Sequence, residues 1–152
     1  MIALRDVTVS FPDGEGTVAV LDGAALEVSA GEVVTISGRS GSGKSTLLAV
    51  AGLLRRPDGG EVVVSGTVAG PLSGRDRTAL RRREIGIIFQ SAELFPSLTA
   101  VQQLELVADI GDGLDAGAKR RARTLLDEVG LERRHDNRPG KLSGGERQRV
   151  GI

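Results

Sequence analysis

The sequence predicts an α/β protein with two subdomains, and three observations carry this prediction. Alternating and apolar runs typical of strands are concentrated in the first part of the chain. A glycine-rich turn followed by a stretch with helical spacing lies among them. Further along, apolar side chains recur every three or four residues, as in amphipathic helices. We therefore expect a mixed region over residues 1–92, with an N-terminal antiparallel β subdomain, and a helical subdomain over residues 93–152.

The first region reads as strands arranged around two helices. Turn-forming residues separate several segments with strand character, which cover residues 2–11, 18–31, 32–38, 59–68 and 85–90. The second of these is broken at Asp22-Gly23. The third is mostly apolar and predicts a fully buried strand. Helices are expected from Lys44 to just before Pro57 and over residues 75–84.

The second region reads as helices throughout. Residues 98–110 and 115–131 have helical spacing. In the latter, the apolar positions three and four residues apart are Ala118, Ala122, Leu125, Leu126 and Val129. A break at residues 137–141 then precedes one more helical stretch.

The composition indicates a soluble globular chain without a strong electric field. Twenty basic and twenty acidic side chains cancel, so we expect no nucleic-acid partner. The arginine-rich residues 75–84 predict a solvated helix face, and a phosphate or partner patch is the alternative. The absence of cysteine excludes disulfides and thiolate metal sites. No apolar run approaches the roughly 18 residues that a membrane-spanning helix needs.

Residues 38–46, GRSGSGKST, match the phosphate-binding pattern G-x-x-x-x-G-K-[ST]. Glycines let successive backbone N–H groups converge on phosphate oxygens, and the helix that follows adds partial positive charge at its N-terminus. Lys44 can reach the β- and γ-phosphates, while the Ser45 hydroxyl is placed to ligate Mg²⁺. The alternative is a simple Gly/Ser-rich turn, but a strand before and a helix after are the context that the motif requires. The expected nucleotide-binding residues are Gly38, Arg39, Ser40, Gly41, Ser42, Gly43, Lys44, Ser45 and Thr46.

Residues 142–146, LSGGE, begin the last helical stretch with two glycines. Ser143 and Glu146 have the spacing of a capping box, but that motif does not require Gly144 and Gly145. Each glycine costs about 1 kcal/mol relative to alanine in a helix. Without β-carbons, a ligand can approach the amides of the first turn, and a helix N-terminus favours an anion. We therefore expect a second phosphate-contacting surface at Ser143, Gly144 and Gly145.

These two motifs, in this order, resemble those of the ATP-binding-cassette (ABC) ATPases, whose signature motif is an LSGGQ-type sequence. Residues 82–100 resemble the family's Q-loop segment, and residues 7–16 resemble its adenine-side strand. The resemblance covers essentially the whole chain and is strongest to the lipoprotein-release and macrolide-export branch of bacterial transporter ATPases. It implies a P-loop NTPase core, with ATP and Mg²⁺ as cofactors.

The resemblance also implies roles for individual residues. Gln90 takes the place of the Q-loop glutamine, which would contact Mg²⁺ or the attacking water, so that Gln90 and Lys44 are the expected catalytic residues and Gln90 and Ser45 the metal-contacting ones. Phe11 falls where the family usually has a tyrosine stacked on adenine, and covering of a sheet edge is the alternative. The 143–145 segment of one subunit would contact the γ-phosphate on the P-loop of another. A head-to-tail dimer of cassettes is therefore implied.

The elements that follow the signature motif in the family are not found in residues 1–152. They are an apolar strand that ends in Asp-Glu, a D-loop and a switch histidine. Asp127-Glu128 and His135 precede the signature motif and lie in other patterns. We therefore expect the C-terminal part of the core sheet to be missing, with an apolar sheet edge exposed. The 152-residue chain is expected to bind ATP without efficient hydrolysis.

The resemblance favours the energising subunit of a transporter, bound to a transmembrane permease at the cytoplasmic face of the plasma (inner) membrane. One alternative is a soluble ABC-type ATPase of DNA repair or translation. Such proteins normally carry coiled-coil insertions or tandem cassettes, and the sequence has neither feature. The other alternative is a nucleotide-binding remnant without turnover.

Overall fold

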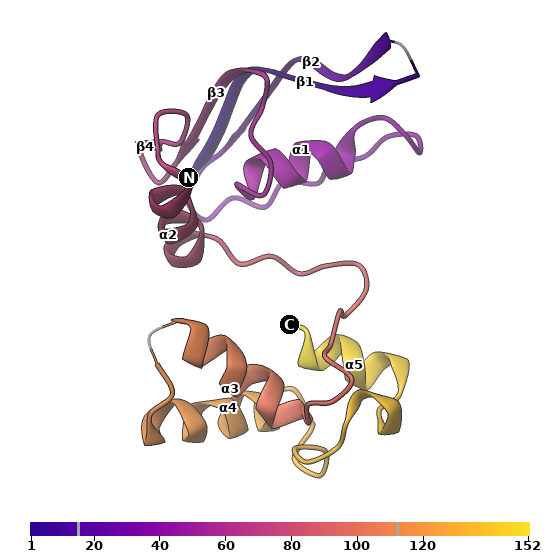
Figure 1. Cartoon of the computed structure of the whole chain (residues 1–152), viewed down its shortest axis with the longest axis vertical. Helices are drawn as coiled ribbons and strands as arrows, with labels where there is room; N and C mark the ends of the chain where they lie inside the picture. The colour runs from indigo at the N-terminus through magenta and orange to yellow at the C-terminus, as the bar shows by residue number, and fades with distance from the viewer. Residues whose placement is uncertain (15, 112) are drawn as a thin grey trace. The chain divides into compact units, whose positions relative to one another are not determined.

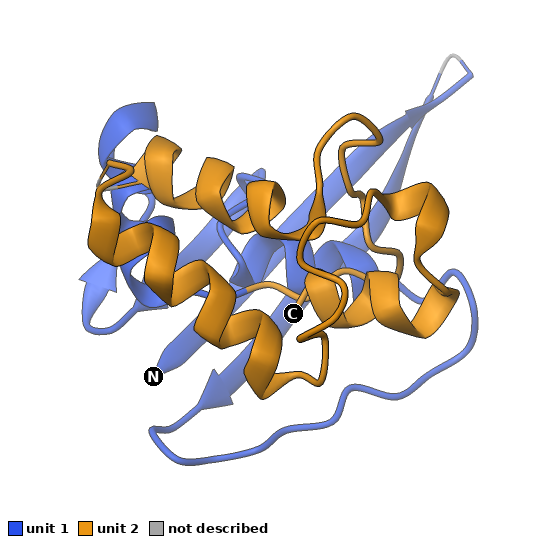
Figure 2. Cartoon of the chain, turned by 90° about the horizontal axis from the view of Figure 1, so that it is seen from below, with its two compact units in different colours: residues 1–86 blue, residues 87–152 orange. Residues whose placement is uncertain are grey.

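The chain divides into two units in its computed structural model, which describes residues 1–14, 16–111 and 113–152. The first unit covers residues 1–86 and the second covers residues 87–152 (Figure 2). The first contains a β-sheet with two helices, and the second is helical, so the α/β fold with an antiparallel β subdomain and a helical part is confirmed.

The first unit is built on a four-stranded antiparallel sheet in the order β2-β1-β3-β4 (Figure 1). The strands are β1 (Ile2–Asp13), β2 (Gly16–Val28), β3 (Gly59–Val64) and β4 (Thr67–Val68). Residues Ser65 and Gly66 join the last two strands, both with positive φ, as a tight two-residue hairpin turn requires. The buried core of this unit includes Leu4, Val7, Val9, Val62 and Val64.

Two helices complete the first unit. Helix α1 (Lys44–Ala51) is shorter than expected, because Gly52 follows it and Leu53 adopts a positive φ of 56°. Helix α2 (Gly74–Glu84) begins where the Ser73 hydroxyl accepts a hydrogen bond from the Asp76 amide at 3.1 Å. The expected solvated face of α2 is interrupted by Arg77, which is only 6% exposed. Its guanidinium donates to the backbone carbonyls of Leu53 and Arg55, which lie just beyond α1.

Two segments predicted as strands are not strands in the structure. Residues 32–38 and 85–90 pair with no strand among the described residues. Val33 is 94% exposed, so the burial expected for residues 32–38 was also wrong. A strand is held by hydrogen bonds to a neighbouring strand, and a local apolar pattern does not reveal whether that neighbour is present. The described residues therefore form no parallel core sheet, in agreement with the expectation that part of the core sheet is missing.

The second unit is a small helical assembly. It contains α3 (Ala100–Gly111), α4 (Ala116–Glu128), the short 3-10 helix η1 (Pro139–Lys141) and α5 (Gly144–Val150). Its core combines apolar residues of all three α-helices and of the loops beside them, namely Ala100, Val101, Ala122, Leu126, Leu131, Leu142 and Val150. Throughout the described parts of both units, every helix is too short or too polar to cross a lipid bilayer.

Candidate nucleotide-binding site

The glycine-rich loop surrounds a cavity of about 410 Å³ in the first unit. The loop leads into α1, and the cavity is lined by Val20 of β2 together with residues 40–46. None of these lining residues is acidic, and the cavity is open to solvent. The cavity is therefore suited to an anion with several oxygen atoms rather than to a cation.

Gly43 fixes how the loop enters α1. It is the N-cap residue, with φ of +83°, and a β-carbon at this position would lie 2.7 Å from the carbonyl oxygen of Val20. Only glycine combines this positive φ with so close a backbone approach. Because Gly43 has no side chain, it cannot accept a hydrogen bond from the first turn of α1. By contrast, the side chains of Ser73 and Ser143 accept such a hydrogen bond at the N-termini of α2 and α5. The first amides of α1 thus remain available to a bound anion.

Lys44 supplies a positive charge at the loop. Its Nζ donates hydrogen bonds to the carbonyl oxygens of Gly38 and Arg39, at 2.8 and 2.6 Å, and lies 3.4 Å from the Ser42 hydroxyl. Within the described residues, Lys44 forms no ion pair with a carboxylate. The ammonium group is therefore positioned over the loop and carries charge that a phosphate can neutralise.

The donor set of the loop fits magnesium bound together with phosphate. Ser45 is exposed in the first turn of α1 and offers one hydroxyl oxygen. The described parts of the chain contain no group of three histidine, aspartate or glutamate side chains that could hold a metal. Mg²⁺ commonly binds through one or two protein oxygens, with phosphate and water oxygens completing its octahedron. The residues present therefore fit Mg²⁺ held jointly with a nucleotide.

Phe11 lies close to the free end of the β1–β2 hairpin, where its register partner is Val18 of β2. Phe11 as a whole residue is 37% exposed. The guanidinium carbon of Arg55 lies 4.0 Å from the centroid of the ring, which is the geometry of a cation–π contact. Sequence reasoning missed Arg55, because nothing local to the residues after α1 indicates a contact with β1.

Ser143 and Glu146 form the capping box predicted from their spacing. The Ser143 hydroxyl accepts from the Glu146 amide at 3.2 Å, and the Glu146 carboxylate accepts from the Ser143 amide at 2.7 Å. The Nε of Arg134 donates to the same carboxylate at 2.8 Å. These hydrogen bonds, that from Arg134 above all, lower the pKa of Glu146 to about 2. Sequence reasoning missed Arg134, which precedes the motif in an irregular loop.

The two glycines of this motif are not required by the packing of the chain itself. Both are exposed. A β-carbon would meet only the tip of the Arg147 side chain, 4.0 Å from Gly144, and that of Arg149, 3.8 Å from Gly145. Neither glycine has a positive φ. Internal sterics therefore leave the glycine pair unexplained, whereas approach of an external group would explain it.

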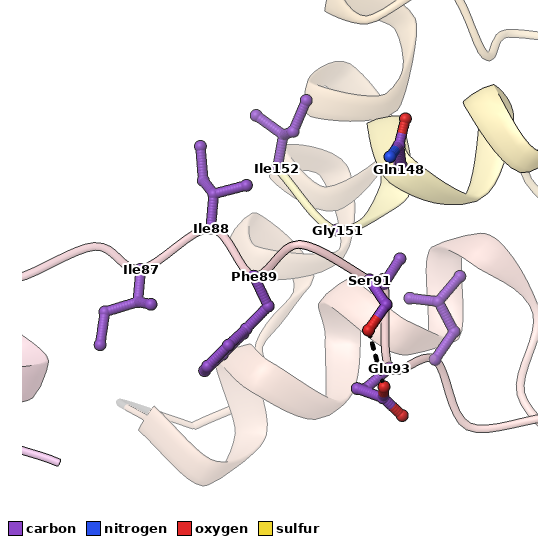
Figure 3. A pocket seen from close by; sticks show the side chains of 10 residues that line it. Ile87, Ile88, Phe89, Ser91, Glu93, Gln148, Gly151 and Ile152 are labelled. Carbon is purple, nitrogen blue, oxygen red and sulfur yellow. Dashed lines mark hydrogen bonds between the residues drawn. The ribbon is translucent and has the colours of Figure 1, made fainter. Parts of the chain in front are cut away.

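Gln90 lies in the irregular segment between α2 and α3, and its side chain is exposed. Residues 87–89 and 91–94, on either side of it in the sequence, line a cavity of about 400 Å³ together with Gln148 of α5 and with Gly151 and Ile152, which follow that helix (Figure 3). The Ser91 hydroxyl donates to the Glu93 carboxylate at 2.9 Å along one side of it. The P-loop and Phe11 thus belong to the first unit, and Gln90 and the 143–145 segment belong to the second.

Comparison with known proteins agrees with this arrangement of motifs. The profile of the ABC transporter family matches residues 21–152. The lipoprotein-releasing system ATP-binding protein LolD of Paramagnetospirillum magneticum is 46% identical over 151 residues, which are 99% of this chain and 67% of that protein. The LolD protein of Nitrobacter hamburgensis is 43% identical over 152 residues, which are all of this chain and 66% of that protein.

Solved structures of ATP-binding cassettes are also similar to this chain. A post-hydrolysis dimer of the ATP-binding cassette MJ0796, bound to ADP and Pi, superposes with a TM-score of 0.89 and 36% identity over 99% of this chain and 67% of that chain. Another dimeric structure of MJ0796, described as a bacterial ABC transporter cassette, superposes with a TM-score of 0.90 and 37% identity over all of this chain and 67% of that one. The chain spans about two thirds of the length of these relatives. It belongs to the ABC transporter family, whose cassettes are ATPases.

Proposed function

We propose that the chain is the ATP-binding subunit of an ABC transporter, which couples ATP binding and hydrolysis to transport through a separate membrane permease. The observation that carries the proposal is the loop that ends at Gly43. It combines first-turn amides of α1 that no side chain caps, Lys44, which forms no ion pair with a carboxylate of the described residues, and a cavity of about 410 Å³ that no described acidic residue lines. The names of the LolD relatives support a role in lipoprotein release.

Within this site, the backbone of residues 38–46 would hold the phosphates, and Lys44 would neutralise the β- and γ-phosphate charge. The Ser45 hydroxyl and the Gln90 amide would hold Mg²⁺. When bound, Mg²⁺ would help to neutralise the negative charge of the phosphates. Phe11, a residue that is 37% exposed, would stack on adenine with its ring.

The segment Ser143, Gly144 and Gly145 would contact the γ-phosphate bound to a second cassette in a head-to-tail dimer. The exposed glycine pair, which the packing of the chain does not require, supports this role. The dimeric state of MJ0796 in the titles of its structures supports it as well. A permease partner and a position on the cytoplasmic face of the inner membrane belong to the same proposal.

Residues 1–152 by themselves would bind ATP without efficient hydrolysis. Hydrolysis needs a group that orients the attacking water, in addition to groups that hold phosphate and metal. Among the residues that the structure describes, no carboxylate lines the cavity of the P-loop. The Asp127-Glu128 pair lies at the end of α4, where Asp127 Oδ1 is 2.7 Å from His135 Nε2 and is thus already engaged in a contact within its own unit.

Titration calorimetry of the chain with ATP and Mg²⁺ tests the nucleotide site. Replacing Lys44 by alanine is expected to weaken binding by tenfold or more, about 1.4 kcal/mol. Lys119→Ala, at an exposed position of α4, removes the same charge elsewhere and is expected to leave the affinity unchanged. Equal affinities of the wild type and Lys44→Ala would refute the assignment.

The genes beside the coding sequence test the transporter role separately. A neighbouring gene for a protein with several membrane spans is expected, and the purified permease should bind the chain. A permease that fails to bind a chain with intact ATP affinity would contradict the transport role and leave the nucleotide site in place.

A further inference from the structure

We infer that Arg55 is a positioning residue for nucleotide binding: its guanidinium supports one face of the Phe11 ring so that the opposite face receives a planar base. The inference rests on the nucleotide site proposed above and adds to it a residue that determines how the base, rather than the phosphates, is held.

The geometry around Phe11 carries the inference. The guanidinium carbon of Arg55 lies 4.0 Å from the ring centroid. A terminal nitrogen of Arg55 also donates to the carbonyl oxygen of Ser10 at 3.1 Å. The amide of Ser10 donates to the carboxylate of Asp58 at 2.6 Å. Both backbone groups of the residue before Phe11 are thus held by the loop that follows α1.

Arg55 is held for this contact rather than free in solvent. Its Nε is buried and has no hydrogen-bond partner in the described part of the chain. A guanidinium with a buried, unpaired N–H gives up a favourable interaction. The cation–π contact with Phe11 and the hydrogen bond to Ser10 keep the guanidinium in this place. Planar guanidinium groups stack well on aromatic rings, whereas an ammonium group does so less well.

The position of the ring relative to the P-loop explains why its orientation matters. Val18 is the register partner of Phe11, and Val20, two residues further along β2, lines the phosphate cavity. Helix α1 begins at Lys44, and Arg55 follows its end. The groups that would hold phosphate and the group that supports the ring are therefore attached to opposite ends of one short helix.

Comparison of two ligands separates the base from the phosphates. ATP carries both, and inorganic tripolyphosphate carries phosphates alone. In calorimetric titrations of the full 152-residue chain, Arg55→Ala is expected to weaken ATP binding about fivefold, in line with loss of a partly desolvated cation–π support. The affinity for tripolyphosphate is expected to stay the same. Arg55→Lys, which keeps the charge, should recover part of the loss.

A mutant cycle shows whether Arg55 acts through the ring. Phe11→Ala should also lower the affinity for ATP alone, and the double variant should bind ATP no more weakly than Phe11→Ala, because coupled residues are not additive. Arg56→Ala is the matched control. Its guanidinium donates to the carbonyls of Gly70 and Leu72 and is not the group that covers the Phe11 ring. The ATP affinity of Arg56→Ala should equal that of the wild type.

Several outcomes would overturn the inference. Equal weakening of ATP and tripolyphosphate would mean that Arg55 acts on the fold, and tighter ATP binding would mean that its guanidinium occupies the place of the base. Additive losses of ATP affinity in the double variant would mean that Arg55 does not act through Phe11. If Arg55→Ala fails to fold, Arg55→Lys serves instead. A ratio of ATP affinity to tripolyphosphate affinity equal to that of the wild type would then contradict the inference. Failure of the proposed function looks different, because the wild type would then bind neither ligand.

Discussion

The imidazole of His135 lies 2.7 Å from the carboxylate of Asp127, measured from Nε2 to Oδ1. The other ring nitrogen lies 3.3 Å from a guanidinium nitrogen of Arg123, a group that can only donate. Nδ1 therefore accepts, and Nε2 carries the proton that is donated to Asp127. The backbone carbonyl of His135 accepts from the amide of Val101 at 2.9 Å. The contact between Asp127 and His135 thus links α4 to the loop beside the start of α3.

This role predicts the effect of removing the carboxylate. Asp127→Ala leaves the Nε2 proton of His135, whose side chain is 13% exposed, without its partner. The free energy of unfolding is expected to fall by about 1–2 kcal/mol in urea titrations. Glu128→Ala changes the exposed neighbour and should stay within about 0.5 kcal/mol of the wild type. A large loss of ATP affinity in Asp127→Ala, without loss of stability, would contradict a purely structural role.

The carboxylate of Glu146 makes a second prediction, on pH. Arg134 and the Ser143 amide lower its pKa from 4.5 to about 2. Because the folded-state pKa is lower than the unfolded one, the stabilisation is complete above pH 4.5 and disappears as the pH falls toward 2. The stability difference between the wild type and Glu146→Gln should therefore shrink across this window in urea titrations. A difference that stays constant from pH 7 to pH 2 would show that ionisation of Glu146 does not contribute.

The entry into α1 makes a third prediction. Gly43→Ala would force a side chain into a φ of +83° and bring a β-carbon within 2.7 Å of the Val20 carbonyl oxygen. We expect a loss of about 1–3 kcal/mol in unfolding free energy. Gly70→Ala is the matched control, because its β-carbon would meet no atom within 4 Å. Calorimetry should also record weaker ATP binding for Gly43→Ala, and unchanged stability of that variant would mean that the loop adapts.

A fourth prediction concerns turnover by the 152-residue polypeptide. Phosphate release from ATP in the presence of Mg²⁺ should stay near background, because no carboxylate in the described part of the chain lines the P-loop cavity to orient water. Robust hydrolysis that is abolished by Lys44→Ala would contradict this expectation. Asp127 and Glu128 would then have to be tested as the source of the base.

The sequence was most informative where function and local structure depend on short, contiguous patterns. The P-loop spacing predicted a loop at the start of a helix, and the structure has Gly43 at the N-cap of α1. The spacing of Ser143 and Glu146 predicted a capping box, which is present. In both cases the interacting groups lie within six residues of one another, so their chemistry is visible in the sequence itself.

Prediction was weaker where the partner lies far away in the chain. Residues 32–38 have the composition of a buried strand, yet strand formation depends on a neighbour that composition does not specify. Arg77 was expected among solvated arginines, but carbonyls beyond the end of α1 draw its guanidinium into the interior. The contact between Arg55 and Phe11 likewise depends on how the loop after α1 meets β1.

The extended segments without strand partners have a consequence for how the polypeptide behaves in concentrated solution. Val33, Ile88 and Phe89 are exposed on stretches whose backbone N–H and C=O groups are not engaged in a described sheet. Such stretches can add a strand from another molecule, because pairing satisfies the backbone and covers the apolar side chains together. Self-association through these segments would compete with the proposed head-to-tail dimerisation of cassettes, and only the proposed dimer would depend on ATP.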